Sequence, residues 1–146
     1  MTRGTAELLD RARQGLRDAR RLRAEIPRIA GREAYLAAFH AAQALIYERT
    51  GKLAKTHRGV RSQFARLMKE EPGLQGISIE VLSRGYEVKS RVDYGVGTTA
   101  HVSARTAEAI IDEAAAFIDA LARLLSQEQE QDELAVFCQY LCGCCW

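Results

Sequence analysis

Long hydrophobic runs are missing from this 146-residue sequence. No stretch of about 18 apolar residues occurs, so we expect no segment that crosses a membrane. The first ten residues, MTRGTAELLD, contain no apolar core of a signal peptide. We therefore expect a cytoplasmic protein. The apolar fraction of 47% and the charged fraction of 27% are typical of a soluble domain with one core.

Proline is scarce, and no stretch shows the alternation of apolar and polar residues that is typical of β-strands. The chain has only two prolines, Pro27 and Pro72, and leucine, alanine and arginine are abundant. These residues favour helix, and no stretch of period two competes with the helical pattern. The sequence therefore predicts an all-α protein, an antiparallel bundle of about five helices.

Several motifs of catalytic chemistry are also absent. There is no Gly-x4-Gly-Lys phosphate loop, no Gly-x-Ser-x-Gly nucleophile elbow and no carboxylate-rich spacing for a metal ion. The sequence thus gives no support to a P-loop nucleotidase, an α/β-hydrolase or a metalloenzyme. We expect neither a cofactor nor a bound metal.

Cysteine is absent from the first 137 residues. The tail holds all of them: Cys138, Cys142, Cys144 and Cys145. Their spacing is not the paired Cys-x2-Cys of structural zinc sites. Three interpretations stay open: an appended segment, an apolar packing or dimerising tail, or a metal or redox site. We divide the chain into a helical domain, 1–126, and an acidic linker with a cysteine-rich tail, 127–146.

The segment from Arg32 to Gly51 organises the rest. At helical spacing it is apolar over most of its circumference, which predicts a central helix surrounded by others. One stripe is formed by Tyr35, Phe39, Ala42 and Ile46. A second, more polar stripe is formed by Leu36, His40, Gln43 and Tyr47.

Four further helices follow from the hydrophobic periodicity. They are expected at 2–25, 57–70, about 78–94 and 103–126. Thr56 and Ser78 are suitable N-caps, and Gly51 is a suitable left-handed C-cap. Pro27 is expected to close the first helix. Residues 1–28 contain eight arginines and four acidic residues, either a solvated helix face or a track for an RNA backbone.

The candidate chemistry rests on three histidines and one arginine-rich helix end. His101 lies in a loop shortly after Arg91, Asp93 and Tyr94. An imidazole can move a proton, and a guanidinium can stabilise charge that develops on phosphorus. This pair suffices in principle for RNA cleavage without a metal. The other histidines are His40 and His57.

Three sequence blocks resemble HEPN-domain proteins of the small stand-alone branch. They are AYLAAFHAA from Ala34, KTHRGV from Lys55 and RVDYG from Arg91. The resemblance covers roughly residues 5–125. It implies a helical bundle that forms a homodimer and is often encoded beside a minimal nucleotidyltransferase. Many such proteins are toxins or defence ribonucleases that cleave RNA near the dimer cleft.

The resemblance carries a role over to Arg91, which would contact the scissile phosphate, with Asp93 beside it. From its place in the loop that follows, we expect His101 to be the acid or base, with His40 or His57 as alternatives. Nine residues separate Arg91 from His101, a longer spacing than in the family's Arg-to-His motif. The expected substrate-binding residues are His40, His57, Tyr94 and Tyr47.

Two other functions remain open. The chain could be a non-catalytic dimeric module that binds nucleotide or RNA and acts through a partner enzyme. It could also be a simple helical scaffold. The resemblance further suggests that a nucleotidyltransferase antitoxin modifies Tyr94 and thereby blocks a phosphate-binding cleft.

Overall fold

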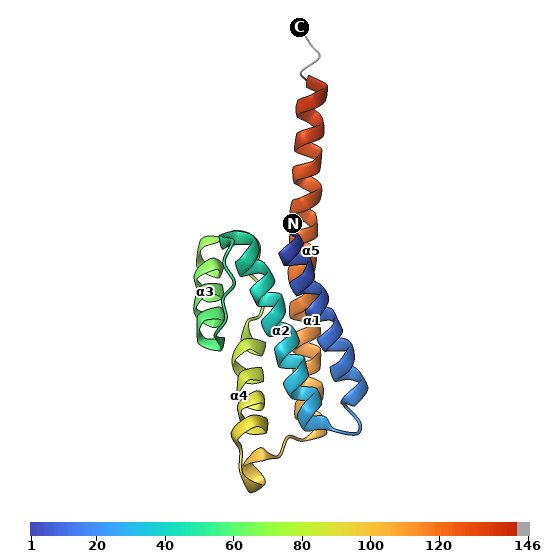
Figure 1. Cartoon of the computed structure of the whole chain (residues 1–146), viewed down its shortest axis with the longest axis vertical. Helices are drawn as coiled ribbons and strands as arrows, with labels where there is room; N and C mark the ends of the chain where they lie inside the picture. Colours follow the sequence, from blue (N-terminus) through green and yellow to red (C-terminus); the bar gives the residue numbers. More distant parts are fainter. Residues whose placement is uncertain (143–146) are drawn as a thin grey trace.

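The computed structural model describes the backbone through Cys142 and the side chains through Cys138 (Figure 1). The part described is all-α, as predicted. Its elements are α1 (Arg3–Leu22), α2 (Pro27–Thr50), α3 (His57–Glu70), the 3-10 helix η1 (Pro72–Leu74), α4 (Glu80–Tyr94), the 3-10 helix η2 (Gly97–Ala100) and α5 (Ala104–Cys142). None of these helices is both long enough and apolar enough to span a bilayer.

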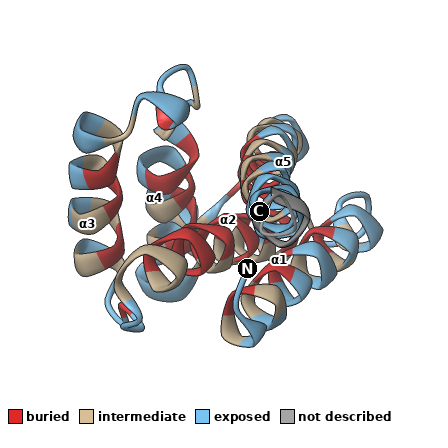
Figure 2. Cartoon of the chain, turned by 90° about the horizontal axis from the view of Figure 1, so that it is seen from above, coloured by how far each residue is buried: buried red, intermediate tan, exposed pale blue. Residues whose placement is uncertain are grey.

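Helix α2 lies at the centre of the bundle, as its all-round apolar pattern predicts. It packs against α1 and α5 on one side and against α4 and α3 on the other (Figure 2). Its small side chains allow these neighbours to come close. The buried alanines of α2 are Ala30, Ala34, Ala37, Ala38, Ala41, Ala42 and Ala44.

Local signals in the sequence fix most helix ends. Thr56 caps α3, because its hydroxyl accepts a hydrogen bond of 3.0 Å from the Gly59 amide. Gly51 ends α2 with a φ of 67°, a conformation that suits glycine. Pro27 ends the preceding helix, as predicted, and it is also the first residue of α2. Proline suits this position because the amide of a helix's first residue has no partner within the helix.

The expected end of the last helix near Ser126 is wrong. Helix α5 continues without a break to Cys142, through the run QEQEQDE. Glutamine and glutamate are good helix formers, and extending an existing helix costs much less than nucleating a new one. The last turns of α5 project beyond the bundle (Figure 1). The side chains of Cys142, Cys144 and Cys145 lie outside the part that the structure describes.

Helix α4 lies close against α2 because Gly85 has no side chain. A Cβ atom at Gly85 would lie 2.9 Å from Cδ2 of Tyr35 and 3.0 Å from its Cβ. The ring of Tyr35 is fully buried in this contact. The close packing brings the polar residues of α4 next to the start of α3, where the candidate site lies.

Candidate functional site between α2, α3 and α4

The site is centred on His57, the first residue of α3. Its half-buried imidazole is packed among three aromatic rings. The ring centroids of Phe39, Tyr86 and Tyr35 lie 4.8, 5.3 and 5.6 Å from that of the imidazole. These rings come from α2 and α4, so the position of His57 depends on the packing of three helices. The ring is therefore held in a defined orientation.

The hydroxyl of Tyr35 fixes the tautomer of His57. The Tyr35 oxygen lies 2.8 Å from Nδ1 of the imidazole. Burial raises the pKa of Tyr35, so the phenol keeps its proton. Because this hydroxyl is buried and has no other acceptor among the described residues, it donates to Nδ1. The neutral imidazole then carries its proton on Nε2, the nitrogen left for a ligand.

Cationic side chains surround the imidazole. The guanidinium of Arg61 lies over the ring of Tyr86, 4.8 Å from its centroid. Burial lowers the pKa of His57, and the charges of Lys89 and Arg61 lower it further, whereas Asp93 opposes them. His57 is therefore neutral at neutral pH, in a positive local field. Such a field favours an anion.

Asp93 forms two ion pairs, one with Arg32 of α2 and one with Lys89 of α4 itself. Its Oδ1 accepts a hydrogen bond of 2.8 Å from Nε of Arg32, and its Oδ2 lies 2.8 Å from Nζ of Lys89. Burial works to raise the pKa of Asp93, but the hydrogen bonds from Lys89 and Arg32 outweigh it and lower the pKa. The carboxylate is ionised and both oxygens are occupied. Asp93 is therefore better suited to positioning Arg32 and Lys89 than to transferring a proton.

The other candidate residues at and after the end of α4 are more exposed than His57. The side chain of Arg91 is exposed and, within the described chain, makes no ion pair with Glu87, four residues earlier. Tyr94 is 76% exposed, and Nζ of Lys89 lies 5.2 Å from the centroid of its ring. His101 is an exposed residue that follows η2. No hydrogen bond joins His101 to Arg91 in the described chain.

His40 lies on the other side of α2, toward α1. Its Nδ1 is 2.8 Å from Oε1 of Gln43, and Nε2 of Gln43 donates to the Ala54 carbonyl at 2.6 Å. This chain of bonds ties the connector before α3 to α2. The bond from Gln43 satisfies a buried amide, so the polar residues of this stripe have a structural role.

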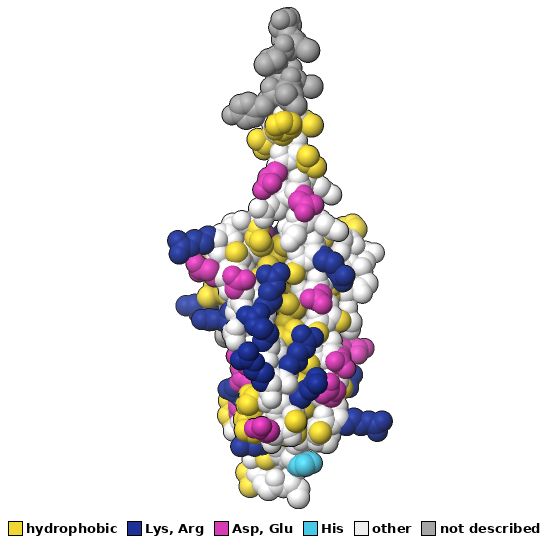
Figure 3. Space-filling view, turned by 90° about the vertical axis from the view of Figure 1, so that its right-hand side faces the viewer, with side chains coloured by type: hydrophobic (Ala, Val, Ile, Leu, Met, Phe, Trp, Pro, Cys, Tyr) yellow, Lys and Arg dark blue, Asp and Glu magenta, His cyan; other side chains and the backbone are white. Residues whose placement is uncertain are grey.

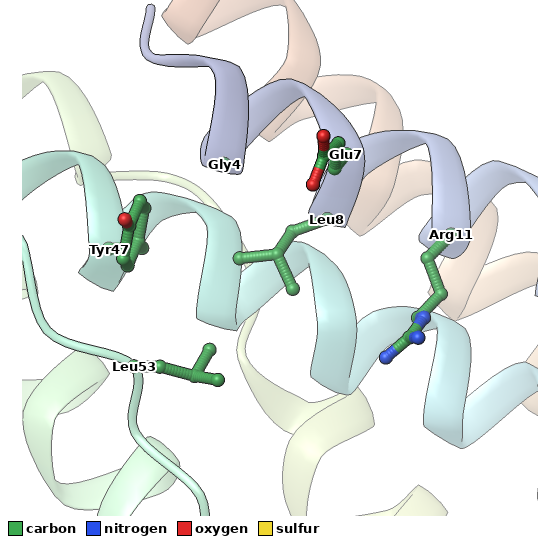
Figure 4. Close-up of a pocket in the computed structure, with 6 residues that line it drawn as sticks. All are labelled: Gly4, Glu7, Leu8, Arg11, Tyr47 and Leu53. Atoms are coloured by element: carbon green, nitrogen blue, oxygen red, sulfur yellow. The ribbon is translucent and has the colours of Figure 1, made fainter.

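Tyr47 also lies at the contact between α1 and α2. It borders a cavity of about 310 Å³ (Figure 4). The other lining residues are Gly4, Glu7, Leu8, Arg11 and Leu53. The predicted substrate-binding residues are thus divided between two surfaces. His57 and Tyr94 lie on the α3–α4 side, whereas His40 and Tyr47 lie on the α1 side.

The predicted set omitted residues that complete the site. Sequence reasoning selected His57 and Asp93 but not Arg61, Lys89 or Tyr35. One signal was available, because Arg61 follows His57 by four residues and Asp93 follows Lys89 by four. Side chains at that spacing share a helix face. The contact between Tyr35 and His57 has no such local signal.

Comparison with known families was made over the whole chain. No functionally curated protein matches the sequence. The family model described as the HEPN domain matches residues 5–132. This match includes α2, α3 and α4 in full and most of α1 and α5, and it contains every residue of the site around His57. The chain therefore belongs to the HEPN domain family.

Proposed function

We propose that this protein binds RNA through phosphate groups held at the site around His57. The observation that carries the proposal is the fixed imidazole, whose Nδ1 is bound to Tyr35 and which has Arg61 and Lys89 beside it. Nε2–H of His57 would donate to a phosphate oxygen. Arg61 would add a charged donor, and charge-assisted hydrogen bonds to phosphate are strong.

The basic residues at this site differ in their availability. Lys89 is shared with Asp93, whereas Arg61 has no ion pair among the described residues. The guanidinium of Arg61 lies over the ring of Tyr86, and this contact holds the side chain near His57 before a ligand binds. Arg61 is therefore the main phosphate ligand in this proposal, and Lys89 supplies a positive field.

The test is binding of a fluorescent single-stranded RNA, measured by anisotropy at low salt. Removing a charge-assisted bond should weaken binding about tenfold, so we expect this loss for Arg61→Gln and for His57→Phe. Arg66→Gln changes the same charge at an exposed position of α3 and should bind as wild type does. Thermal melts would establish that each variant is folded. Unchanged affinity in both site variants would contradict the proposal.

A competition experiment separates RNA from free nucleotide. ATP and inorganic phosphate share the phosphate chemistry, so each is added to the complex of protein and RNA. We expect RNA to be displaced only at concentrations far above the Kd for RNA, because RNA offers several phosphates to one surface. Displacement by ATP at equal concentration would instead assign the site to a nucleotide.

The fixed tautomer of His57 favours a second candidate function, metal-independent RNA cleavage by a toxin or defence protein. Because Nδ1 accepts a hydrogen bond from Tyr35, Nε2–H of His57 would stabilise charge on a phosphate oxygen, and the exposed His101 would move the proton. Arg91 would then stabilise the charge on phosphorus. Cleavage in the presence of EDTA, and growth arrest on expression, should both disappear in His57→Phe and Arg91→Ala. RNA binding without cleavage by the wild type would restrict the function to binding.

Control by a nucleotidyltransferase partner is proposed at Tyr94. The exposed phenol lies close to the ammonium group of Lys89. A nucleotide attached there would bring bulk and negative charge to the edge of the site. Mass spectrometry after co-expression with the product of a neighbouring gene should find one added nucleotide in the wild type and none in Tyr94→Phe. An unmodified Tyr94 would remove this control from the proposal.

A further inference from the structure

The cavity beside Tyr47 has a wall that is mostly apolar. Figure 4 shows the side chains of Leu8, Tyr47 and Leu53 around one space, and they come from α1, α2 and the connector that follows α2. Leu53 is 45% exposed, so the cavity is open to solvent on that side. Its volume of about 310 Å³ is at the lower end of the range for ligand pockets. The cavity therefore suits a small apolar group.

The ring of Tyr47 is a fixed part of this wall. It lies directly on α1, because Gly4 has no side chain there. A Cβ atom at Gly4 would lie 2.5 Å from Cε1 of the ring and 3.1 Å from Cζ. The ring is thus in place before a ligand binds, which lowers the cost of binding.

One cation at the cavity has no partner. The carboxylate of Glu7 accepts a hydrogen bond of 2.8 Å from Nε of Arg3. Asp10 pairs with Arg13 at 3.5 Å, and Arg11 has no ion pair within the described chain. The charge of Arg11, at the edge of the cavity, is therefore available to a ligand (Figure 4).

The surroundings of Arg11 favour an anion. Helix α1 contains six arginines and three acidic residues. Figure 3 shows basic side chains gathered over the α1 side of the bundle. Such a field attracts negative charge. A single guanidinium matches the charge and both oxygens of one carboxylate, whereas a phosphate monoester has further charge and a further oxygen to satisfy.

We propose that this cavity binds an apolar group that carries one carboxylate. The apolar group lies between Tyr47 and the leucines Leu8 and Leu53, and Arg11 holds the carboxylate through two parallel hydrogen bonds. A free organic acid and the C-terminal residue of a peptide share this chemistry. The cavity lies on the other side of α2 from His57, so this site is independent of the proposed RNA site.

The first test is an NMR titration of the full-length chain with 3-phenylpropionate. We expect the amide signals of Gly4 and Leu53 to shift, and Arg11→Gln to weaken binding about tenfold. Arg20→Gln is the matched control, because Arg20 is also an exposed arginine of α1. It should bind as wild type does, and the amide spectra would establish that both variants are folded. No binding by the wild type, or unchanged affinity in Arg11→Gln, would overturn the proposal.

The second test compares ligands. 3-Phenylpropionamide keeps the ring without the charge and should bind about tenfold more weakly than the acid. Equal binding of the amide, or tighter binding of phenyl phosphate, would overturn the carboxylate class. A peptide that ends in phenylalanine is compared with its amidated form, and only the free carboxylate should bind. If this peptide binds more tightly than 3-phenylpropionate, the ligand is a protein C-terminus; the reverse order indicates a free acid.

The third test locates the carboxylate through His40. Arg11 also lines the neighbouring groove that contains His40. Burial lowers the pKa of His40, and the charge of Arg11 lowers it further. A carboxylate on Arg11 offsets that charge, so saturation with 3-phenylpropionate should raise the pKa of His40 in the wild type and not in Arg11→Gln. An unchanged pKa in the wild type, measured by NMR, would place the carboxylate elsewhere and overturn the assignment.

Discussion

At the scale of single residues, the position of His57 depends on Gly85, which has no side chain. Gly85 allows α4 to touch the ring of Tyr35, and Tyr35 in turn holds Nδ1 of His57. The Cβ of Tyr35 is attached to the backbone of α2 and cannot move aside cheaply. The geometry of the site therefore depends on a residue that has no polar group.

Gly85→Ala should lower the free energy of unfolding by about 1–3 kcal/mol, the usual cost of overpacking a core. The added methyl would lie 2.9 Å from the ring of Tyr35. Urea denaturation would measure the loss. Gly73→Ala is the control, because its Cβ would be 3.5 Å from Leu124, an ordinary contact. Equal stability of the two variants would show that α4 adjusts without strain.

Glu48 carries a charge that the fold stabilises strongly. Burial would raise its pKa, but hydrogen bonds from the Thr2 amide and the Thr5 hydroxyl, at 2.9 and 2.5 Å, help lower it to about 2. Because the pKa of Glu48 is lower in the folded state than in the unfolded state, its ionised carboxylate stabilises the fold fully at pH values above 4.5, the pKa of the unfolded chain. This stabilisation is lost as the pH falls from there through about 2.

We therefore expect Glu48→Gln to cost about 2 kcal/mol at pH 7 and much less near pH 2. Urea denaturation across this pH range would measure the difference. The control is Glu7→Gln, which removes an exposed carboxylate paired with Arg3 and should change stability little at either pH. A constant difference between Glu48→Gln and wild type from pH 7 to pH 2 would refute the linkage.

At the scale of elements, Arg49 fastens the end of α2 to two distant segments. Its Nε donates to both oxygens of Glu71 at 2.9 and 3.0 Å. Its two terminal nitrogens donate to Glu128 on α5 at 3.0 and 2.6 Å. One planar guanidinium thus satisfies two carboxylates, which a lysine ammonium cannot do with the same geometry.

Arg49→Gln should destabilise the protein by about 1–3 kcal/mol, because Glu71 and Glu128 lose their shared counter-charge and face each other. Arg66→Gln breaks a more exposed pair with Glu70, 3.7 Å apart, and should cost less than about 0.5 kcal/mol. Thermal unfolding of both variants would compare them. Similar melting temperatures would mean that the network on Arg49 contributes no more than a surface pair.

Helix positions were predictable where the chain carries a local signal. Thr56 marked the start of α3, and the spacing of Val60, Phe64 and Leu67 marked its buried face. The end of α5 was not predictable in this way, because the charged run after Ser126 has no breaker and continues the helix. Hydrophobic periodicity shows which helix faces are buried, not where a polar helix ends.

The candidate site was predictable only in part, for a related reason. His57, Asp93 and Tyr94 stood out in the sequence because they occupy short polar blocks. Their partners come from different helices: Arg32 from α2 contacts Asp93, and Tyr35 contacts His57. Such contacts depend on how α4 and α3 pack on α2, which no spacing within one helix reveals.

At the scale of the whole molecule, α2 separates two surfaces of different character. The α3–α4 side carries the aromatic and cationic site around His57. The α1–α5 side carries a groove of about 540 Å³ that is lined mostly by polar and charged side chains.

The run of alanines in α2 has a mechanical consequence. Long side chains can change rotamer and absorb a small shift of a neighbouring helix, but a methyl group cannot. Helices α1, α4 and α5 rest almost directly on the backbone of α2. A displacement of a helix on one side of α2 is therefore passed on to the helices on the other side, because the methyl groups between them cannot absorb it.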